Sequence, residues 1–322
     1  RWAGFASGAF MTGNYAEAYK IYEKMRAINP ADPVVLARLD IIRARLGKDF
    51  FIQQKDKRVA EKIRKKVLVK PGPLSKDMPY VRVGLMENAA KVEFLASTRY
   101  TVRTKQAGLL VAQGSAGEVC SVSSGAGNKI MFVFKNRDTS VADEPVVLTP
   151  DDPSGTCTIL GVSAGKGNYW QAQEDRSYRG QIEIAAAAGG LRIINILSME
   201  EYLYSVVPSE MLSTWPFEAL KAQAVAARSE AMHKLGRHKT DGYDFCAEVH
   251  CQSYGGVEKE AGASNLAVDQ TRGFILQYKG KAVDAVYSSC CGGHTQDNIF
   301  GTGAPEVPYF QGIPDTLSRP DM

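Results

Sequence analysis

The sequence has few cysteines and histidines, nearly balanced charge and no long apolar run. Six cysteines among 322 residues are too sparse for a small domain stapled by disulfides, although an even number permits bridges in an exported protein. No segment approaches the roughly 20 apolar residues that a membrane-spanning helix needs. The net charge of +4 is too small to indicate nucleic-acid binding; it suits a carboxylate-bearing polymer or ordinary solvated side chains. What remains is a globular protein whose function must be carried by short motifs.

The sequence also lacks an initiator methionine and a signal peptide. It begins at Arg1, and its first residues have the pattern of the middle of a helix. We therefore expect it to be part of a longer protein, so the missing leader says nothing of its compartment. The length predicts two or three structural units.

Residues 1–50 are predicted to be helical. Small and aromatic residues follow Gly13-Asn14-Tyr15 at helical spacing as far as Asn29-Pro30, and a further helix is expected over 32–46. This spacing resembles a tetratricopeptide repeat, in which two helices interlock and a proline ends the second. A plain helical hairpin is the alternative. Repeats of this kind would offer a surface for a protein partner.

Residues 51–79 are interpreted as a basic linker. The stretch is polar, has little periodicity and contains Pro71-Gly72-Pro73, which cannot continue a helix. The domain boundary is therefore placed here, and one domain is expected over 80–322.

Within this domain, residues 80–197 are predicted to be β-rich and residues 198–322 to hold helices and catalytic loops. Clusters of Gly, Asn and Asp separate short β-prone runs, which favours antiparallel strands over parallel strands with crossover helices. Gly189-Gly190 is a good hairpin turn between the last two runs. The fold class is therefore α+β. The expected strands cover residues 81–85, 92–95, 100–102, 109–111, 130–134, 146–148, 178–184 and 191–197.

Glu210 is the first candidate for a catalytic residue. Ser198 and Glu201 form a capping box that starts a helix. Pro208 is expected to end it, because proline lacks the backbone N–H and restricts the residue before it. Glu210 would then lie in a connection between two helices, where catalytic groups are often placed. The alternative is a first-turn carboxylate that stabilises the next helix.

The next helix, predicted over 216–235, carries two basic residues on one face. Lys221 and Arg228 are two turns apart, so they could border a cleft at Glu210 and bind an anionic substrate. A solvated charged face is the alternative. Tyr309 is a further candidate for substrate binding, by stacking against a sugar, unless it is a core aromatic.

Cys246, His250 and Cys251 have the composition of a zinc site, since thiolates and imidazole suit Zn²⁺. Their spacing is not that of a standard zinc finger. The fourth ligand could be Cys290, Cys291, water or substrate. Buried structural thiols, or a disulfide to the Cys290/Cys291 pair, are the alternatives.

The remaining cysteines allow other interpretations. Cys120 and Cys157 lie in the same strand-rich region and could form a disulfide, which the sequence does not decide. Cys291 and His294 could be a nucleophile and its base, but two such groups in one short loop rarely form a catalytic pair.

Several motifs, in the same order along the chain, resemble the stage II sporulation protein D (SpoIID/LytB) family. The resemblance extends over about residues 80 to 315. Here two cysteines precede a double glycine where the family usually has one. The motifs are Met199-Glu200-Glu201-Tyr202-Leu203, Val207-Pro208-Ser209-Glu210-Met211, Leu220-Lys221-Ala222-Gln223-Ala224-Val225-Ala226-Ala227-Arg228, His250-Cys251-Gln252-Ser253-Tyr254-Gly255-Gly256 and Tyr287-Ser288-Ser289-Cys290-Cys291-Gly292-Gly293-His294-Thr295.

The resemblance implies an extracytoplasmic lytic transglycosylase that cleaves peptidoglycan glycan strands, particularly strands without stem peptides. Glu210 takes the position of the family's single acid/base. It would protonate the glycosidic oxygen and then remove the proton from the C6 hydroxyl of muramic acid, which attacks to give an anhydro sugar. No water is activated, so a second catalytic carboxylate is not required.

The resemblance also bears on the other candidates. Lys221 and Arg228 match positions expected to hold the substrate. Zinc at Cys246, His250 and Cys251 agrees with some family members, where it would pin the loops around the cleft. A non-catalytic enhancer of a cell-wall amidase is the first alternative function, and a glycan-binding scaffold whose helices recruit a partner is the second.

Overall fold

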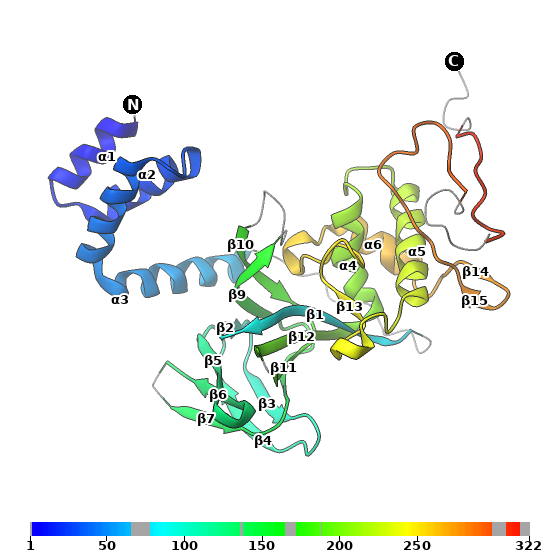
Figure 1. Cartoon of the computed structure of the whole chain (residues 1–322), viewed down its shortest axis with the longest axis horizontal. Coiled ribbons are helices and arrows are strands. Elements are labelled where there is room, and N and C mark those ends of the chain that lie inside the picture. The colour runs from blue at the N-terminus through cyan, green and yellow to red at the C-terminus, as the bar shows by residue number, and fades with distance from the viewer. Residues whose placement is uncertain are drawn as a thin grey trace. The chain divides into compact units, whose positions relative to one another are not determined.

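The protein is described by a computed structural model that covers residues 2–65, 78–135, 138–164, 172–187, 189–297 and 307–315. The chain divides into two compact units, Arg1–Val67 and Leu68–Met322 (Figure 1). The predicted break at 71–73 lies outside the described residues. None of the helices in the described ranges combines the length and the apolar character needed to cross a membrane.

The first unit consists of α1 (Trp2–Met11), α2 (Tyr15–Ile28) and α3 (Pro33–Lys65). Asn14 caps α2 by accepting a hydrogen bond from the Glu17 N–H, and the Asp32 carboxylate accepts from two N–H groups at the start of α3. The helices enclose a small separate core. Its buried members are Ala6, Ala18, Ile21, Tyr22, Val35, Leu39 and Ile42.

The predicted linker is wrong over residues 51–65, which continue α3 to Lys65. This stretch is rich in Lys, Arg, Glu, Gln and Ala, all good helix formers, so it needs no apolar periodicity to be helical. The helical run bends at Gly47, whose φ of +71° is left-handed. The likeness to a tetratricopeptide repeat stays a prediction.

The second unit contains two sheets whose apolar faces contribute to one core. Pairing within both is antiparallel, except between β1 and β13, which confirms the predicted mainly antiparallel domain. The first sheet has the order β13 (Phe245–Cys246), β1 (Tyr80–Ala89), β12 (Gly190–Ser198), β11 (Gln181–Ala187), β8 (Val146–Pro150), β3 (Tyr100–Thr104) and β4 (Leu110–Gly114). The second has the order β10 (Ala172–Tyr178), β9 (Cys157–Ala164), β2 (Lys91–Ala96), β5 (Cys120–Gly125), β6 (Lys129–Val133) and β7 (Thr139–Ala142).

The strand predicted over 178–184 is in fact two strands, β10 and β11, in different sheets. The chain turns at Gly180, which has φ +72° and whose Cβ, if present, would lie 2.3 Å from the Ile196 carbonyl oxygen. Only glycine fits there. The hairpin between β11 and β12 is confirmed, with Ala187 paired to Gly190.

Cys120 and Cys157 are buried and form no disulfide. They face different residues of β2, Phe94 and Ala96, on its two sides. Burial raises the pKa of Cys120 to about 12, so this thiol behaves as a small core residue.

Three helices, α4 (Met199–Glu210), α5 (Phe217–His233) and α6 (Gly262–Gln270), pack against one another beside the first sheet (Figure 1). The predicted capping box at Ser198 and Glu201 starts α4 directly after β12. Inside, the Tyr202 ring stacks 5.2 Å from Tyr254 and 5.5 Å from Phe245. These rings join α4 to β13 and to the loop after it. Short 3₁₀ turns at Ala126–Asn128, Lys239–Asp241 and Val257–Lys259 and a small ribbon of β14 (Gln277–Tyr278) and β15 (Lys281–Ala282) complete the unit.

Candidate functional site

Glu210 is the last residue of α4, so the prediction that Pro208 ends the helix and leaves Glu210 in a connection is wrong. A proline in the last turn removes one backbone bond. That turn is supported by Ser209, whose hydroxyl donates to the Ser205 carbonyl at 2.7 Å. Nor is Glu210 a first-turn carboxylate of the next helix, because α5 begins only at Phe217 and the acidic residue of its first turn is Glu218. The Glu210 side chain is exposed at the end of α4.

Glu210 lines a pocket of about 190 Å³. This is smaller than sites that enclose a whole drug-sized ligand, so it suits one part of a longer molecule. The wall combines carboxyl, ammonium, phenol and apolar groups. The lining residues are Glu210, Glu230, Lys234, Val249, His250, Cys251, Val286 and Tyr287.

A short loop after β13 holds the Glu210 carboxylate. The Ser253 N–H donates to Glu210 Oε1 at 2.9 Å. The neighbouring Gln252 is buried; its amide donates to the Ala227 carbonyl at 3.2 Å and to the Tyr287 hydroxyl at 3.0 Å. Burial, and then the charge of Glu210, raise the pKa of Tyr287 well above its ordinary value, so this phenol stays protonated. The loop thus fixes both Glu210 and Tyr287.

Four side chains beside the pocket form a group that could hold a metal ion. The donor atoms of His238, Cys246, His250 and Cys251 all lie within 4.8 Å of one another. His250 Nδ1 is central, 3.6 Å from Cys246 Sγ, 3.7 Å from Cys251 Sγ and 3.3 Å from His238 Nε2. Two thiolates and two imidazoles are a common ligand set of structural zinc.

Further contacts suit these residues to a metal. The Asp241 carboxylate lies 3.0 Å from His238 Nδ1, which favours a proton there and leaves Nε2 with its lone pair toward the group. The Cys251 thiol, as a hydrogen-bond donor, holds the pKa of Cys246 below its ordinary value. The donor set therefore fits a cation that prefers sulfur and nitrogen.

The sequence predicted three members of this group and missed the fourth, His238. Cys290 and Cys291, considered for that place, are exposed and lie outside the group, with Cys291 Sγ 3.4 Å from Asp315. His238 stands eight residues before Cys246, too far for a short motif. The signal that could have found it was the small number of histidines. The chain has only four, so a histidine close in sequence to Cys246 and His250 is informative.

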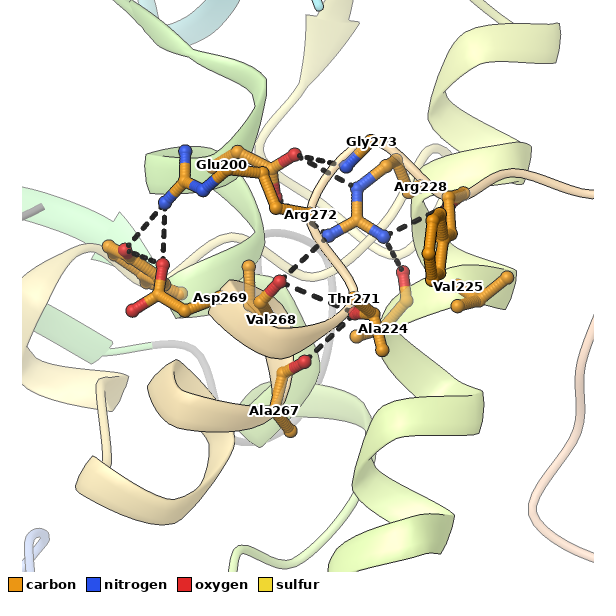
Figure 2. A network of polar contacts seen from close by, with 12 residues as sticks. Glu200, Ala224, Val225, Arg228, Ala267, Val268, Asp269, Thr271, Arg272 and Gly273 are labelled. Carbon is orange, nitrogen blue, oxygen red and sulfur yellow. Dashed lines mark hydrogen bonds and ion pairs between the residues drawn. The ribbon is translucent and has the colours of Figure 1, made fainter. Parts of the chain in front are cut away.

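Arg228 is fully buried, and a role in substrate binding does not fit its position. Its guanidinium pairs with Glu200 at 2.7 Å and donates to the carbonyls of Val268 and Phe274 at 3.2 and 3.1 Å. Figure 2 shows this group between α4, α5 and the chain leaving α6, with Glu200 also accepting from the Gly273 N–H at 3.2 Å. Arg228 therefore joins the three helices.

Lys221 lies nearer the start of α5 and is not among the pocket residues. Its ammonium pairs with Glu218 at 2.9 Å and lies 5.7 Å from the centre of the Phe217 ring. Both partners come from its own helix. The basic residue that reaches the pocket is Lys234, just after α5, which sequence reasoning missed.

Tyr309 belongs to a small aromatic cluster near the pocket. Its ring centre lies 5.5 Å from that of Tyr278 and 5.1 Å from that of Phe310. Its hydroxyl accepts a hydrogen bond of 3.4 Å from the N–H of Asp284, which in turn lies 3.8 Å from the ammonium of Lys234. The ring is 36% exposed, so it is not a core aromatic.

Glu230 and Tyr287 are pocket residues that the sequence did not single out as site residues. Glu230 sits on α5, one turn before Lys234 and two residues after Arg228. A helical pattern alone does not separate its role from that of an ordinary polar residue. Tyr287 is the first residue of the SpoIID motif that runs to Thr295, and that motif was the signal that could have found it.

Comparison with known proteins agrees with this region. Residues 187–278, which include Glu210 and all four possible metal ligands, match the family model for SpoIID, stage II sporulation protein. This region belongs to the SpoIID family. The predicted recognition is confirmed, with the family model matching residues 187–278 of the predicted 80–315.

Several known proteins are similar to part of this chain. An uncharacterized protein of Brachyspira hyodysenteriae is 42% identical over 38% of this chain and 33% of its own length. The amidase enhancer of Bacillus subtilis is 40% identical over 35% of this chain and 15% of its own length. Stage II sporulation protein D of the same organism is 29% identical over 36% of this chain and 38% of its own. The matched part is well under half of each relative.

Proposed function

We propose that this protein is a lytic transglycosylase that cleaves peptidoglycan glycan strands, chiefly strands without stem peptides. Glu210 is its single acid/base. The observation that carries the proposal is the Glu210 carboxylate, exposed on a pocket and held by the Ser253 N–H within a SpoIID domain. An extracytoplasmic location, in the periplasm or cell wall, follows from that substrate.

The proposed reaction uses one carboxyl group twice. Protonated Glu210 gives its proton to the glycosidic oxygen as the bond to C1 breaks. The resulting carboxylate takes the proton of the C6 hydroxyl as that oxygen bonds to C1. The proton lost in the first step is recovered in the second, and the product ends in a 1,6-anhydro sugar. General acid/base catalysis of this kind contributes about 10²- to 10⁴-fold.

Glu230 makes a rival mechanism worth testing, because glycoside hydrolases use two carboxyl groups and water. Glu230 lines the same pocket but is buried and paired with Lys234. This pairing favours a binding role over activation of water. Digestion of stem-peptide-free glycan in H₂¹⁸O separates the two: the proposed reaction gives anhydro ends without ¹⁸O, whereas hydrolysis gives reducing ends that carry it.

The Glu210→Gln variant tests the assignment of the acid/base. We expect its cleavage rate to fall at least 100-fold while the fold is kept, because Gln can still accept from the Ser253 N–H but cannot transfer a proton. Glu174→Gln, an exposed Glu in β10 whose carboxylate lies 3.3 Å from Arg176, is the matched control. Equal rates for Glu210→Gln and wild type would overturn the proposal.

The second candidate function is stimulation of a cell-wall amidase, favoured by the named amidase enhancer among the relatives. Under this alternative, stimulation needs no cleavage by this chain. If wild type and Glu210→Gln stimulate an amidase equally and neither yields anhydro ends, the enhancer function replaces the enzyme. A glycan-binding scaffold would show binding with neither effect.

The Cys/His group supports a structural zinc ion as cofactor. Cys246, His250 and Cys251, with His238, would hold it, and it would supply a fixed anchor for the loop that carries Ser253. The proton transfers remain with Glu210.

Tyr309 and Lys221, which do not line the pocket, would contact the substrate beyond it. Tyr309 would stack on a sugar beside it, and Lys221 would contact the strand further along α5. The first unit, by its likeness to a tetratricopeptide repeat, would recruit a protein partner through its helices.

A further inference from the structure

The pocket wall contains a charged cluster that the proposed acid/base mechanism does not use. Glu230 and Lys234, one helical turn apart, form an ion pair, and the Lys234 ammonium also lies 3.8 Å from Asp284 Oδ1. Glu230 is only 4% exposed, yet it lines the pocket together with Glu210. Two carboxyl groups therefore share one lysine beside the proposed acid/base.

This cluster is short of hydrogen-bond donors. Glu230 Oε2 and Asp284 Oδ1 are both buried, and neither has a hydrogen-bond partner within the described part of the chain. An unsatisfied buried acceptor is costly, more so when charged. Burial raises the pKa of Glu230, and the nearby Asp284 adds to this rise against the opposing effect of Lys234. Both observations indicate a carboxyl pair that needs a donor.

The charges decide which ligand group suits the cluster. With Glu210 included, three carboxyl groups stand against the ammonium of Lys234, so a ligand carboxylate would be repelled when these groups are ionised. A neutral hydroxyl or amide N–H instead satisfies an acceptor at little electrostatic cost. N-acetylated sugars without an acid group offer both kinds of donor.

We propose that Glu230, positioned by Lys234 and Asp284, is the acceptor of a subsite for an uncharged N-acetylated sugar, next to Glu210. Glu230 Oε2 accepts from a hydroxyl or acetamido N–H of that sugar. The lactyl-bearing sugar, with its carboxylate, is then placed outside this subsite. The substrate class rests on the proposed glycan cleavage; the subsite itself is a binding claim that can be measured without cleavage.

Glu230→Gln is the discriminating substitution. Its amide can donate to Asp284 while its carbonyl oxygen stays toward Lys234, so the internal pairing of the cluster is kept. The acceptor offered to the ligand is lost. If the carboxyl pair merely shares a proton between its own members, this variant binds sugar as well as its parent does.

The experiment measures binding of tri-N-acetylglucosamine by calorimetry to the whole chain carrying Glu210→Gln, which prevents turnover. Adding Glu230→Gln should weaken binding about tenfold or more, the loss expected for one hydrogen bond to a charged group. Adding Glu174→Gln instead should leave the affinity unchanged. The parent and the two double variants must have the same melting temperature. If Glu230→Gln unfolds the chain, Asp284→Asn replaces it and should weaken binding as well, because an Asn amide can donate to Glu230 and occupy the acceptor.

A second comparison tests the preference for an uncharged sugar. The Glu210→Gln chain should bind N-acetylglucosamine more tightly than N-acetylmuramic acid, and Glu230→Gln should reduce this difference. Equal affinities with and without Glu230→Gln, or no binding of sugar by the Glu210→Gln chain, overturn the subsite. Absence of anhydro ends from the wild type overturns the proposed cleavage alone, since the binding difference does not depend on it.

Discussion

At the scale of single residues, the surroundings of each basic side chain decide its role. Arg228 is fully buried between Glu200 and backbone carbonyls, Lys221 pairs within its own helix, and Lys234 reaches the pocket. Guanidinium suits the first position, because its five donors can satisfy several acceptors at once. The two residues that shared a helical face in the sequence thus have different environments.

Arg228→Met should destabilise the second unit by about 3–5 kcal/mol, because it leaves the Glu200 carboxylate buried without its partner. Urea unfolding measures this change. Lys221→Met, which removes a partly exposed pair within one helix, should cost about 0.5 kcal/mol or less. A stable Arg228→Met protein with only a raised KM for glycan would restore the substrate-binding role.

Glu183 should make the stability of this unit sensitive to acid. Burial alone would raise its pKa, but hydrogen bonds from Arg82 and Lys105 outweigh this and hold the pKa below the ordinary 4.5. The contribution is therefore complete above about pH 4.5 and is lost as pH falls through the folded-state pKa. Glu183→Gln should be less stable near pH 7, and the difference should shrink below pH 4.5. A difference that is the same at every pH contradicts this account.

At the scale of elements, the segment from β13 to Tyr254 connects the sheet to the site. Phe245 pairs with Val83 of β1, Cys246 and Cys251 belong to the Cys/His group, and Ser253 donates to Glu210. Anchoring this segment at both ends fixes the carboxylate more firmly than the end of α4 alone could.

Removing the proposed zinc ion should therefore loosen this segment. We expect one zinc ion per chain by elemental analysis, a lower melting temperature after chelation, and loss of the ion in Cys246→Ser. Cleavage should also fall, because the Ser253 N–H would no longer be held against Glu210. Cys290→Ser, at an exposed thiol outside the group, is the matched control. An unchanged melting temperature after chelation would argue against a metal that stabilises the fold.

At the scale of the whole molecule, the chain consists of two units with separate cores. All described residues of the pocket and of the Cys/His group belong to the second unit. Among the described residues, the core of the first unit has seven buried members, which gives little stability on its own.

A chain that begins at residue 68 should retain glycan cleavage within about twofold of the full chain, because it keeps the whole core of its unit. Calorimetry of the full chain should show two transitions, of which only the larger remains after truncation. Loss of cleavage in a truncated chain that still melts cooperatively would show that the first unit takes part in the reaction.

Local signals predicted a good part of this structure. The capping box at Ser198, the Gly189-Gly190 hairpin and most period-two strands depend on neighbours along the chain, and all were predicted correctly. The misses have physical reasons. Strands β5, β7, β9 and β10 contain Gly, Ser, Asp or Glu and gain their order from pairing with distant strands. Pro208 was given too much weight because a last turn tolerates its missing N–H.

The sequence by itself determined the α+β class, the SpoIID motifs, Glu210 as a candidate and three of the four residues of the Cys/His group, because these depend on residue type and short spacing. Only the tertiary structure decided that Arg228 is internal, that Lys234 and Glu230 face the pocket, and that His238 completes the group. Burial and long-range proximity are set by how distant segments pack, and a helical pattern does not distinguish the side of α5 that meets other helices from the side that meets the pocket.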